Sequence, residues 1–194
     1  MKIIYLGMIT MMIVLTLQAQ KAKQKGTVVV SAQAALLNGD KHVNGQFLLT
    51  GGYQLKGWFI GGGTGFDYYK YRTIPAFVDM KKYFGKGDRQ FFIYANGGIN
   101  IAWPTNNQQQ QSGWWGWNAQ QSKFKNGIYT DVGFGCTLFN SKKRGFFTSA
   151  GYSTKTLSET YNEQSWGGPN PPISTKRTLE YTMNRVLIRV GYRF

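Results

Sequence analysis

The segment from Val186 to Phe194 alternates between apolar and polar side chains, and it constrains the fold of this 194-residue chain more than any other stretch. Its even positions carry valine, isoleucine, valine, tyrosine and phenylalanine, whereas Arg185, Arg189 and Arg193 stand at odd positions. Successive side chains of a β-strand point to opposite faces. The pattern therefore predicts a strand that separates an apolar environment from a polar one.

The N-terminal residues predict export from the cytoplasm. Met1-Lys2 is followed by an almost wholly apolar stretch from Ile3 to Leu17 and then by Gln18-Ala19-Gln20. A basic start, an apolar stretch and a small residue form a secretory signal. We expect a signal peptide over residues 1–19, and the remaining residues 20–194 are about as long as one domain.

Alternating segments recur along the chain and are separated by turn residues, as in a series of strands. The expected strands span 27–37, 46–55, 58–68, 74–84, 90–101, 127–139, 145–155 and 179–194. The connections near Lys56, Gly85 and Asn140 are short, whereas residues 103–125 and 156–178 form long ones. The even number of strands and the alternation of short and long loops predict an all-β fold. This fold is an eight-stranded antiparallel up-and-down transmembrane β-barrel. We also expect a β-bulge near Met183, where the alternation changes phase.

A soluble barrel or sandwich would alternate in the same way with its apolar face turned inward. The signal peptide, the aromatic residue Phe194 at the end of the sequence and the loop pattern favour the membrane form. Aromatic residues near the strand ends fit interfacial girdles. These are Tyr53, Trp58, Tyr68, Tyr69, Tyr83, Phe84, Trp103, Tyr152 and Tyr192.

The run from Gly52 to Tyr69 resembles the small, porin-like outer-membrane β-barrel family of Bacteroidetes, and the run from Ile74 to Phe84 matches the next strand of that family. The resemblance covers most of residues 20–194 through loose strand patterns. It implies an eight-stranded membrane barrel. It implies no activity, because the family has no common catalytic or ligand-binding residues.

The chain is strongly basic, with 23 Lys and Arg against 8 Asp and Glu. In an exported barrel, the natural counter-charges are outer-membrane lipid and lipopolysaccharide headgroups, and nucleic acid is not an expected partner. The expected location is the outer membrane, with both termini in the periplasm. Tyr192 and Phe194 are expected to form the terminal signal that the barrel-assembly machinery recognises.

Charged residues opposite the apolar faces predict a polar network in the lumen. Its expected members are Asp67, Asp79, Lys81, Asp131, Arg185 and Arg189. Eight strands leave an interior that side chains fill, so the network is expected to hold the barrel together by ion pairs. A narrow channel or small-solute porin that depends on Asp79, Asp131, Arg185 and Arg189 is the alternative.

Catalytic and metal-binding patterns are weak in this sequence. The glycine run from Gly61 to Gly65 lacks the Lys-Ser/Thr of a phosphate-binding loop, so we expect it to relieve crowding in a strand. His42 beside Asp40 has no serine that the sequence places against it, and Cys136 belongs to no metal-ligand spacing. No cofactor, metal or catalytic residue is predicted. A lipid-acting enzyme that uses His42 is a second alternative.

Two long loops carry tryptophans that need an explanation. Trp114, Trp115 and Trp117 follow a glutamine run, and Trp166 precedes a proline-rich stretch. Tryptophan is enriched at interaction hot spots, although these residues would also suit packing of the loops onto themselves. The sequence thus predicts a non-enzymatic barrel, a structural or accessory subunit of a larger outer-membrane complex, with these four residues as its extracellular contacts.

Overall fold

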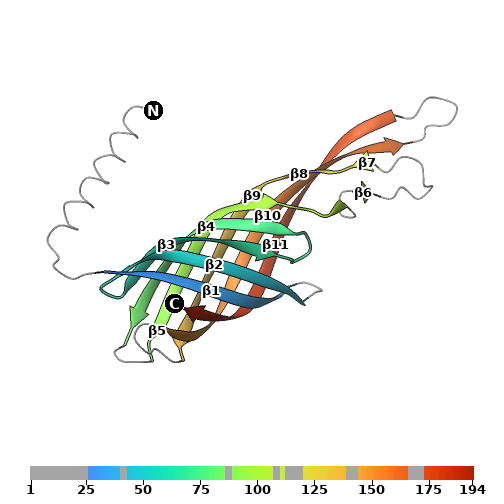
Figure 1. The fold of residues 1–194 in the computed structure, drawn as a ribbon. Coiled ribbons are helices and arrows are strands. Elements are labelled where there is room, and N and C mark those ends of the chain that lie inside the picture. Colours follow the sequence, from blue (N-terminus) through green and yellow to red (C-terminus); the bar gives the residue numbers. More distant parts are fainter. Residues whose placement is uncertain are drawn as a thin grey trace, which may run out of the picture.

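The computed structural model describes residues 26–39, 43–85, 89–106, 110–111, 120–138, 144–165 and 173–194. Eight long antiparallel strands pair in sequence order, and pairing of the first strand with the last closes the sheet. Figure 1 shows the resulting barrel. The strands are β1 (Thr27–Asn38), β2 (Val43–Leu55), β3 (Trp58–Asp67), β4 (Thr73–Phe84), β5 (Phe91–Ala102), β9 (Gly127–Thr137), β10 (Gly145–Ser165) and β11 (Ile173–Arg193). The predicted eight-stranded up-and-down barrel is confirmed.

No helix within the described ranges is long and apolar enough to cross a membrane.

The outer face of the barrel is apolar and the inner face is polar. Val28, Phe91 and Ile188 are 71%, 67% and 63% exposed, whereas Arg185 and Arg189 are 1% and 2% exposed. A soluble barrel has the opposite arrangement, because its apolar side chains fill the interior. The alternation therefore has the sense expected for a barrel surrounded by lipid.

The connection between β2 and β3, predicted to be short, is a two-residue hairpin turn. Lys56 and Gly57 both have positive φ angles, 50° and 77°. Two consecutive residues with positive φ form the turn whose twist matches that of the flanking strands. Glycine at position 57 adopts this conformation without a steric penalty.

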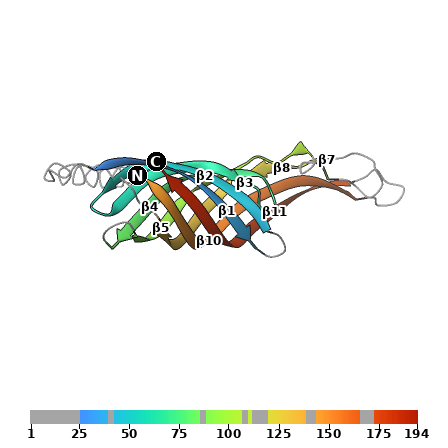
Figure 2. The same ribbon diagram turned by 60° about the horizontal axis from the view of Figure 1, so that its bottom comes forward.

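The predicted long loop over 156–178 is wrong in its type, because most of it is strand. β10 and β11 are 21 residues each and stay paired from Gly145–Arg193 to Ser165–Ile173. Figures 1 and 2 show this hairpin extending beyond the other strands. We call this side of the barrel the hairpin end, and the side with Thr27 and Phe194 the terminal end. The outward positions Thr156, Ser158 and Thr160 are polar, so the apolar alternation of a strand that contacts lipid is missing from this part of the sequence.

The other long connection also contains short strands. β8 (Lys123–Lys125) pairs with β10 opposite Ser158 to Thr160, and β6 (Gln110–Gln111) pairs with β7 (Gln120–Gln121). They lie toward the hairpin end in Figure 1.

The expected β-bulge near Met183 is absent. The register between β10 and β11 runs without interruption through Lys155–Met183. Met183, Arg185 and Leu187 are all buried, so every second side chain of β11 still points inward. The sequence suggested a change of phase because the inward side chains at Met183 and Leu187 are apolar. With Leu37, Tyr69 and Leu157 they form an apolar cluster inside the hairpin end.

The glycine run on β3 makes room inside the barrel, as expected. A Cβ on Gly63 would lie 2.5 Å from the Phe77 ring, and one on Gly65 would lie 1.9 Å from the Phe47 carbonyl oxygen. The inward positions of β3 therefore admit only glycine between Phe59 and Asp67, and large side chains from neighbouring strands fill the space. A phosphate-binding function for this run is excluded, because the glycines are part of a continuous strand.

Candidate functional site: lumen network and rims

Asp67 is the centre of an ion cluster near the hairpin end of the lumen. It is the last residue of β3 and points inward, where Lys155 Nζ lies 2.9 Å from its Oδ1 and the Arg185 guanidinium contacts its Oδ2. Lys155 also donates to the Tyr71 carbonyl oxygen at 3.0 Å and to Thr73 Oγ1 at 3.2 Å. The cluster thereby attaches the β3–β4 turn to β10.

Asp131 on β9 is the centre of the next cluster toward the terminal end. The hydroxyls of Tyr94 and Tyr129 donate to its two oxygens at 3.0 and 3.2 Å, and the Arg189 guanidinium contacts Oδ2. Gln46 Nε2 donates to Tyr129 at 3.3 Å and to Asp67 at 3.2 Å, which links the two clusters. The polar column is thus continuous from β3 to β9.

The third cluster lies at the terminal end. Lys81 Nζ is 2.8 Å from Asp79 Oδ2 on the same strand, and Arg193 contacts the Gln54 amide oxygen and lies over the Tyr83 ring. Each of the three aspartates therefore has a cation against it, as a buried carboxylate requires. A ring cluster of Phe92, Tyr94 and Phe147 packs beside this group.

The lumen is filled with side chains. Arg185, Arg189, Tyr129 and Lys155 are among the largest fully buried residues of the described chain. An eight-stranded barrel is just wide enough for such filling. The arrangement can hold charges in fixed pairs.

The six predicted lumen residues all lie inside the barrel and all take part in these clusters. Sequence reasoning missed Lys155, Tyr129, Gln46 and Glu159. Lys155 carried a usable signal, because it stands in phase with Ser149 and Ser153 on the polar face of β10. Tyr129 carried none, since a tyrosine fits either face of a barrel strand.

Aromatic hydroxyls hold a carboxylate at the hairpin end. Tyr71 and Tyr181 both donate to Glu159 Oε2, at 3.3 and 2.9 Å. Burial raises the pKa of the Tyr71 phenol above its ordinary value, and the nearby carboxylate adds to this effect. The phenol therefore stays protonated and able to donate. The Phe124 ring packs against the Tyr71 ring, and both pack against the apolar cluster inside the hairpin end.

A cation lies over a tryptophan at each edge of the apolar belt. Lys82 Nζ is 4.6 Å from the Trp58 ring centroid near the terminal end, and the Arg72 guanidinium carbon is 4.1 Å from the Trp103 ring centroid near the hairpin end. Arg72 stands directly before β4 and precedes Lys82 by ten positions. At ~3.3 Å per residue and a strand tilt of ~40°, this separation is about 25 Å in height, which is that of the apolar band of a membrane barrel.

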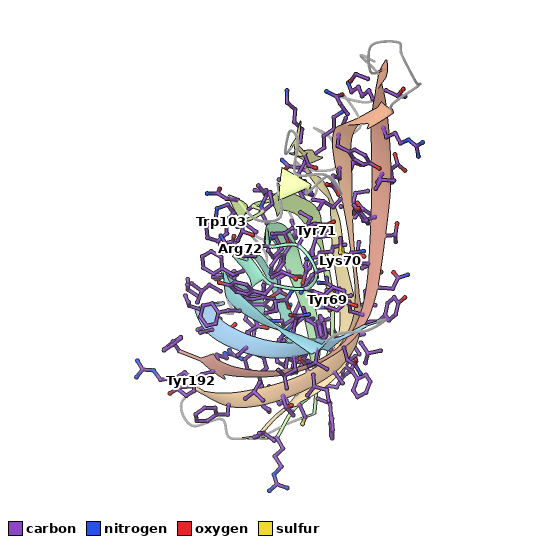
Figure 3. The ribbon with its side chains drawn as sticks, turned by 90° about the vertical axis from the view of Figure 1, so that its right-hand side faces the viewer. Tyr69, Lys70, Tyr71, Arg72, Trp103 and Tyr192 are labelled. Atoms are coloured by element: carbon purple, nitrogen blue, oxygen red, sulfur yellow. The ribbon has the colours of Figure 1, made fainter. Side chains whose placement is uncertain are left out.

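Most of the residues expected in aromatic girdles do lie outside, but two do not. Trp58, Tyr68 and Trp103 are 47%, 49% and 43% exposed. Tyr69 is buried in the hairpin-end cluster, and Tyr83 packs inward against Phe92. The error for Tyr69 arises from the β3–β4 turn, which folds over the lumen (Figure 3).

The remaining predicted site residues divide into two groups. Tyr192 and Phe194 lie on the outer face with their rings 5.0 Å apart, and Tyr192 also meets Phe146 at 4.9 Å. The four tryptophans of the loop contacts lie outside the described residues, as do His42 and the expected signal peptide. Within the described part of the chain, no three His, Cys, Asp or Glu residues gather to hold a metal ion.

Comparison with a solved structure supports this architecture. The N-terminal β-barrel domain of Pseudomonas aeruginosa OprF matches with a TM-score of 0.50 and 13% sequence identity, over 88% of this chain and 100% of that domain. The fold is that of an outer-membrane β-barrel. The outer membrane protein AlkL, solved by solid-state NMR in DMPC bilayers, gives a TM-score of 0.47 and 14% identity, over 89% of this chain and 94% of AlkL. No family model and no curated protein matches the sequence, so membership of a Bacteroidetes family stays a prediction.

Proposed function

We propose that this protein is a non-enzymatic outer-membrane barrel that serves as an accessory subunit and binds a larger outer-membrane protein through its extracellular side. The terminal end faces the periplasm, and the hairpin end faces outward. Residues 1–19 direct export, and residues 20–194 form the barrel domain. The observation that carries the proposal is the β10–β11 hairpin, which extends past the barrel and has an open strand edge.

The open edge belongs to β11. Its pairing with β1 covers only Val186 to Arg193, and no described strand pairs with that edge from Ile173 to Arg185. Phe194 donates its backbone N–H to the Val30 carbonyl oxygen, so even-numbered residues turn their backbone groups toward the β1 side. With no bulge in between, Lys176, Thr178, Glu180 and Thr182 present backbone donors and acceptors to the open edge.

An open edge of this length is a template for another strand. Backbone groups on the edge accept an extended segment by β-strand addition, which supplies affinity without a deep pocket. The side chains here are mostly threonine, serine and charged residues, which keep the edge soluble until a partner covers it. We assign this edge to an extended segment of the larger protein, with Trp114, Trp115, Trp117 and Trp166 as further contacts.

The filled lumen supports a role that lies outside the barrel. Arg185 and Arg189 occupy the interior with their charges already paired. One observation favours the alternative of a narrow channel, namely that the polar column runs without a break from Asp67 to Asp131. Such a channel would require these pairs to separate. The lipid-acting enzyme stays a prediction, and His42→Ala is expected to leave the function intact.

The test is co-purification from native outer membranes in mild detergent. The wild-type protein is expected to bring down a stoichiometric larger protein. Thr178→Pro removes one edge-facing N–H and should abolish this, whereas Thr178→Val keeps the N–H and should retain it. Replacing Trp114, Trp115 and Trp117 with Ala should weaken the complex. A lone barrel from wild-type membranes, or equal recovery with Thr178→Pro, would refute the proposal.

A further inference from the structure

Arg72, Trp103 and Phe66 form one outward-facing group at the hairpin-end rim. Thr73 pairs with Ala102, and the Trp103 N–H donates to the Arg72 carbonyl oxygen at 3.0 Å, so Arg72 and Trp103 lie opposite each other one step beyond the ladder. Side chains of β4 at odd positions and of β5 at even positions point inward, which places Arg72 and Trp103 outside. Figure 3 shows the two residues together.

The group combines an apolar platform with a cation. The Phe66 and Trp103 ring centroids are 5.7 Å apart, and both side chains are more than 40% exposed. The Arg72 guanidinium lies over the other part of the platform, 4.1 Å from the Trp103 ring centroid. A lipid chain would contact Phe66, and a headgroup would reach Arg72 at the edge of the belt.

The charge of Arg72 is not matched by any carboxylate in the part of the chain that the structure describes. Among the described residues, its Nε also has no hydrogen-bond partner, although it is buried. The nearby acid Asp67 points into the lumen and is neutralised there by Lys155 and Arg185. A guanidinium beside hydrocarbon needs an anion, and its planar fork suits two oxygens of one phosphate group.

We propose that Arg72, Trp103 and Phe66 form a binding site for the phosphorylated headgroup of an outer-leaflet glycolipid. Arg72 binds the phosphate, Trp103 holds the guanidinium in place, and Phe66 contacts the first part of an acyl chain. The site rests on the proposed outer-membrane orientation, because it needs the hairpin end to face the outer leaflet. The Lys82–Trp58 pair at the terminal end is the matched comparison. Its ammonium group is a single point charge and lacks the planar set of donors that a guanidinium offers to a phosphate.

Native mass spectrometry of the full chain in detergent, titrated with bisphosphorylated lipid A, tests the site. We expect Arg72→Gln to lower the affinity about tenfold or more, Arg72→Lys to lower it less, and Lys82→Gln to leave it unchanged. Dephosphorylated lipid A should bind the wild type as weakly as bisphosphorylated lipid A binds the Arg72→Gln variant. Unshifted heat-modifiable mobility in gels checks that each variant is folded.

Three outcomes would overturn the inference. These are equal binding by wild type and Arg72→Gln, equal binding of the two lipid A forms, and displacement of lipid A by a modest excess of inorganic phosphate, which would mean a site for the free ion. Co-purification of a partner protein is expected to be unchanged in the Arg72→Gln variant. A failure of this site is therefore distinguishable from a failure of the proposed docking function.

Discussion

Lys155 and Asp67 form an ion pair across the full width of the barrel. Their Nζ and Oδ1 atoms are 2.9 Å apart, although three strands separate β10 from β3 in either direction around the barrel. Both side chains are fully buried. A pair of this kind closes the lumen and ties opposite walls together, and this role underlies the first two predictions.

Lys155→Met should destabilise the barrel by about 1–3 kcal/mol, since Asp67 loses one buried partner and keeps Arg185. Urea unfolding in detergent micelles measures the change. Asp67→Asn and the double variant complete a double-mutant cycle, and a coupling energy of about 0.5–3 kcal/mol is expected. Strictly additive effects would show that the pair does not join the two walls.

The filled lumen predicts that the wild-type protein conducts no steady current in planar bilayers. Arg185→Ala and Arg189→Ala remove two of its largest buried side chains and should increase conductance. Lys82→Ala, which changes an outward residue, is the matched control. Steady wild-type conductance that falls in Asp79→Asn, Asp131→Asn, Arg185→Ala and Arg189→Ala variants would favour the channel alternative.

Two glycine substitutions should behave oppositely although both place a methyl group on a barrel strand. A Cβ on Gly65 would lie 1.9 Å from the Phe47 carbonyl oxygen, whereas a Cβ on Gly97 would meet nothing within 4 Å. Gly65→Ala should cost about 1–3 kcal/mol or prevent folding, and Gly97→Ala should change stability little. Urea midpoints of the refolded proteins test this. Similar midpoints would contradict the packing of β2 against β3.

Phe194→Ala tests the expected assembly signal. Phe194 is exposed and contacts Tyr192 by its ring, so its loss should change the unfolding free energy of the refolded barrel only slightly. The amount of the Phe194→Ala variant in cellular outer membranes should fall severalfold if the barrel-assembly machinery recognises this residue. Phe91→Ala removes a similarly exposed ring from the same end and should not lower the level. Equal levels for the two variants would refute the signal.

The sequence was sufficient for the barrel, because a strand between lipid and a polar lumen must alternate at every second residue. The eight strands and the inward placement of Arg185 and Arg189 follow from this local rule. The rule of alternation failed at positions where a strand does not separate an apolar surrounding from a polar one. Residues 156–165 and 173–178 form strands although their sequence lacks the apolar alternation, and Met183 is an apolar residue on the inward face.

Alternation determined which face each charged residue occupies, but only the closed structure decided which partner it meets. Lys155 reaches Asp67, and Gln46 reaches Tyr129, across distances in the sequence of more than 80 residues. Such pairs depend on how the strands are staggered when the sheet closes, and no local pattern records that stagger. Pairing of the neighbouring strands β4 and β5 placed Arg72 beside Trp103, and the closing pair of β1 with β11 left the β11 edge from Ile173 to Arg185 without a described partner strand.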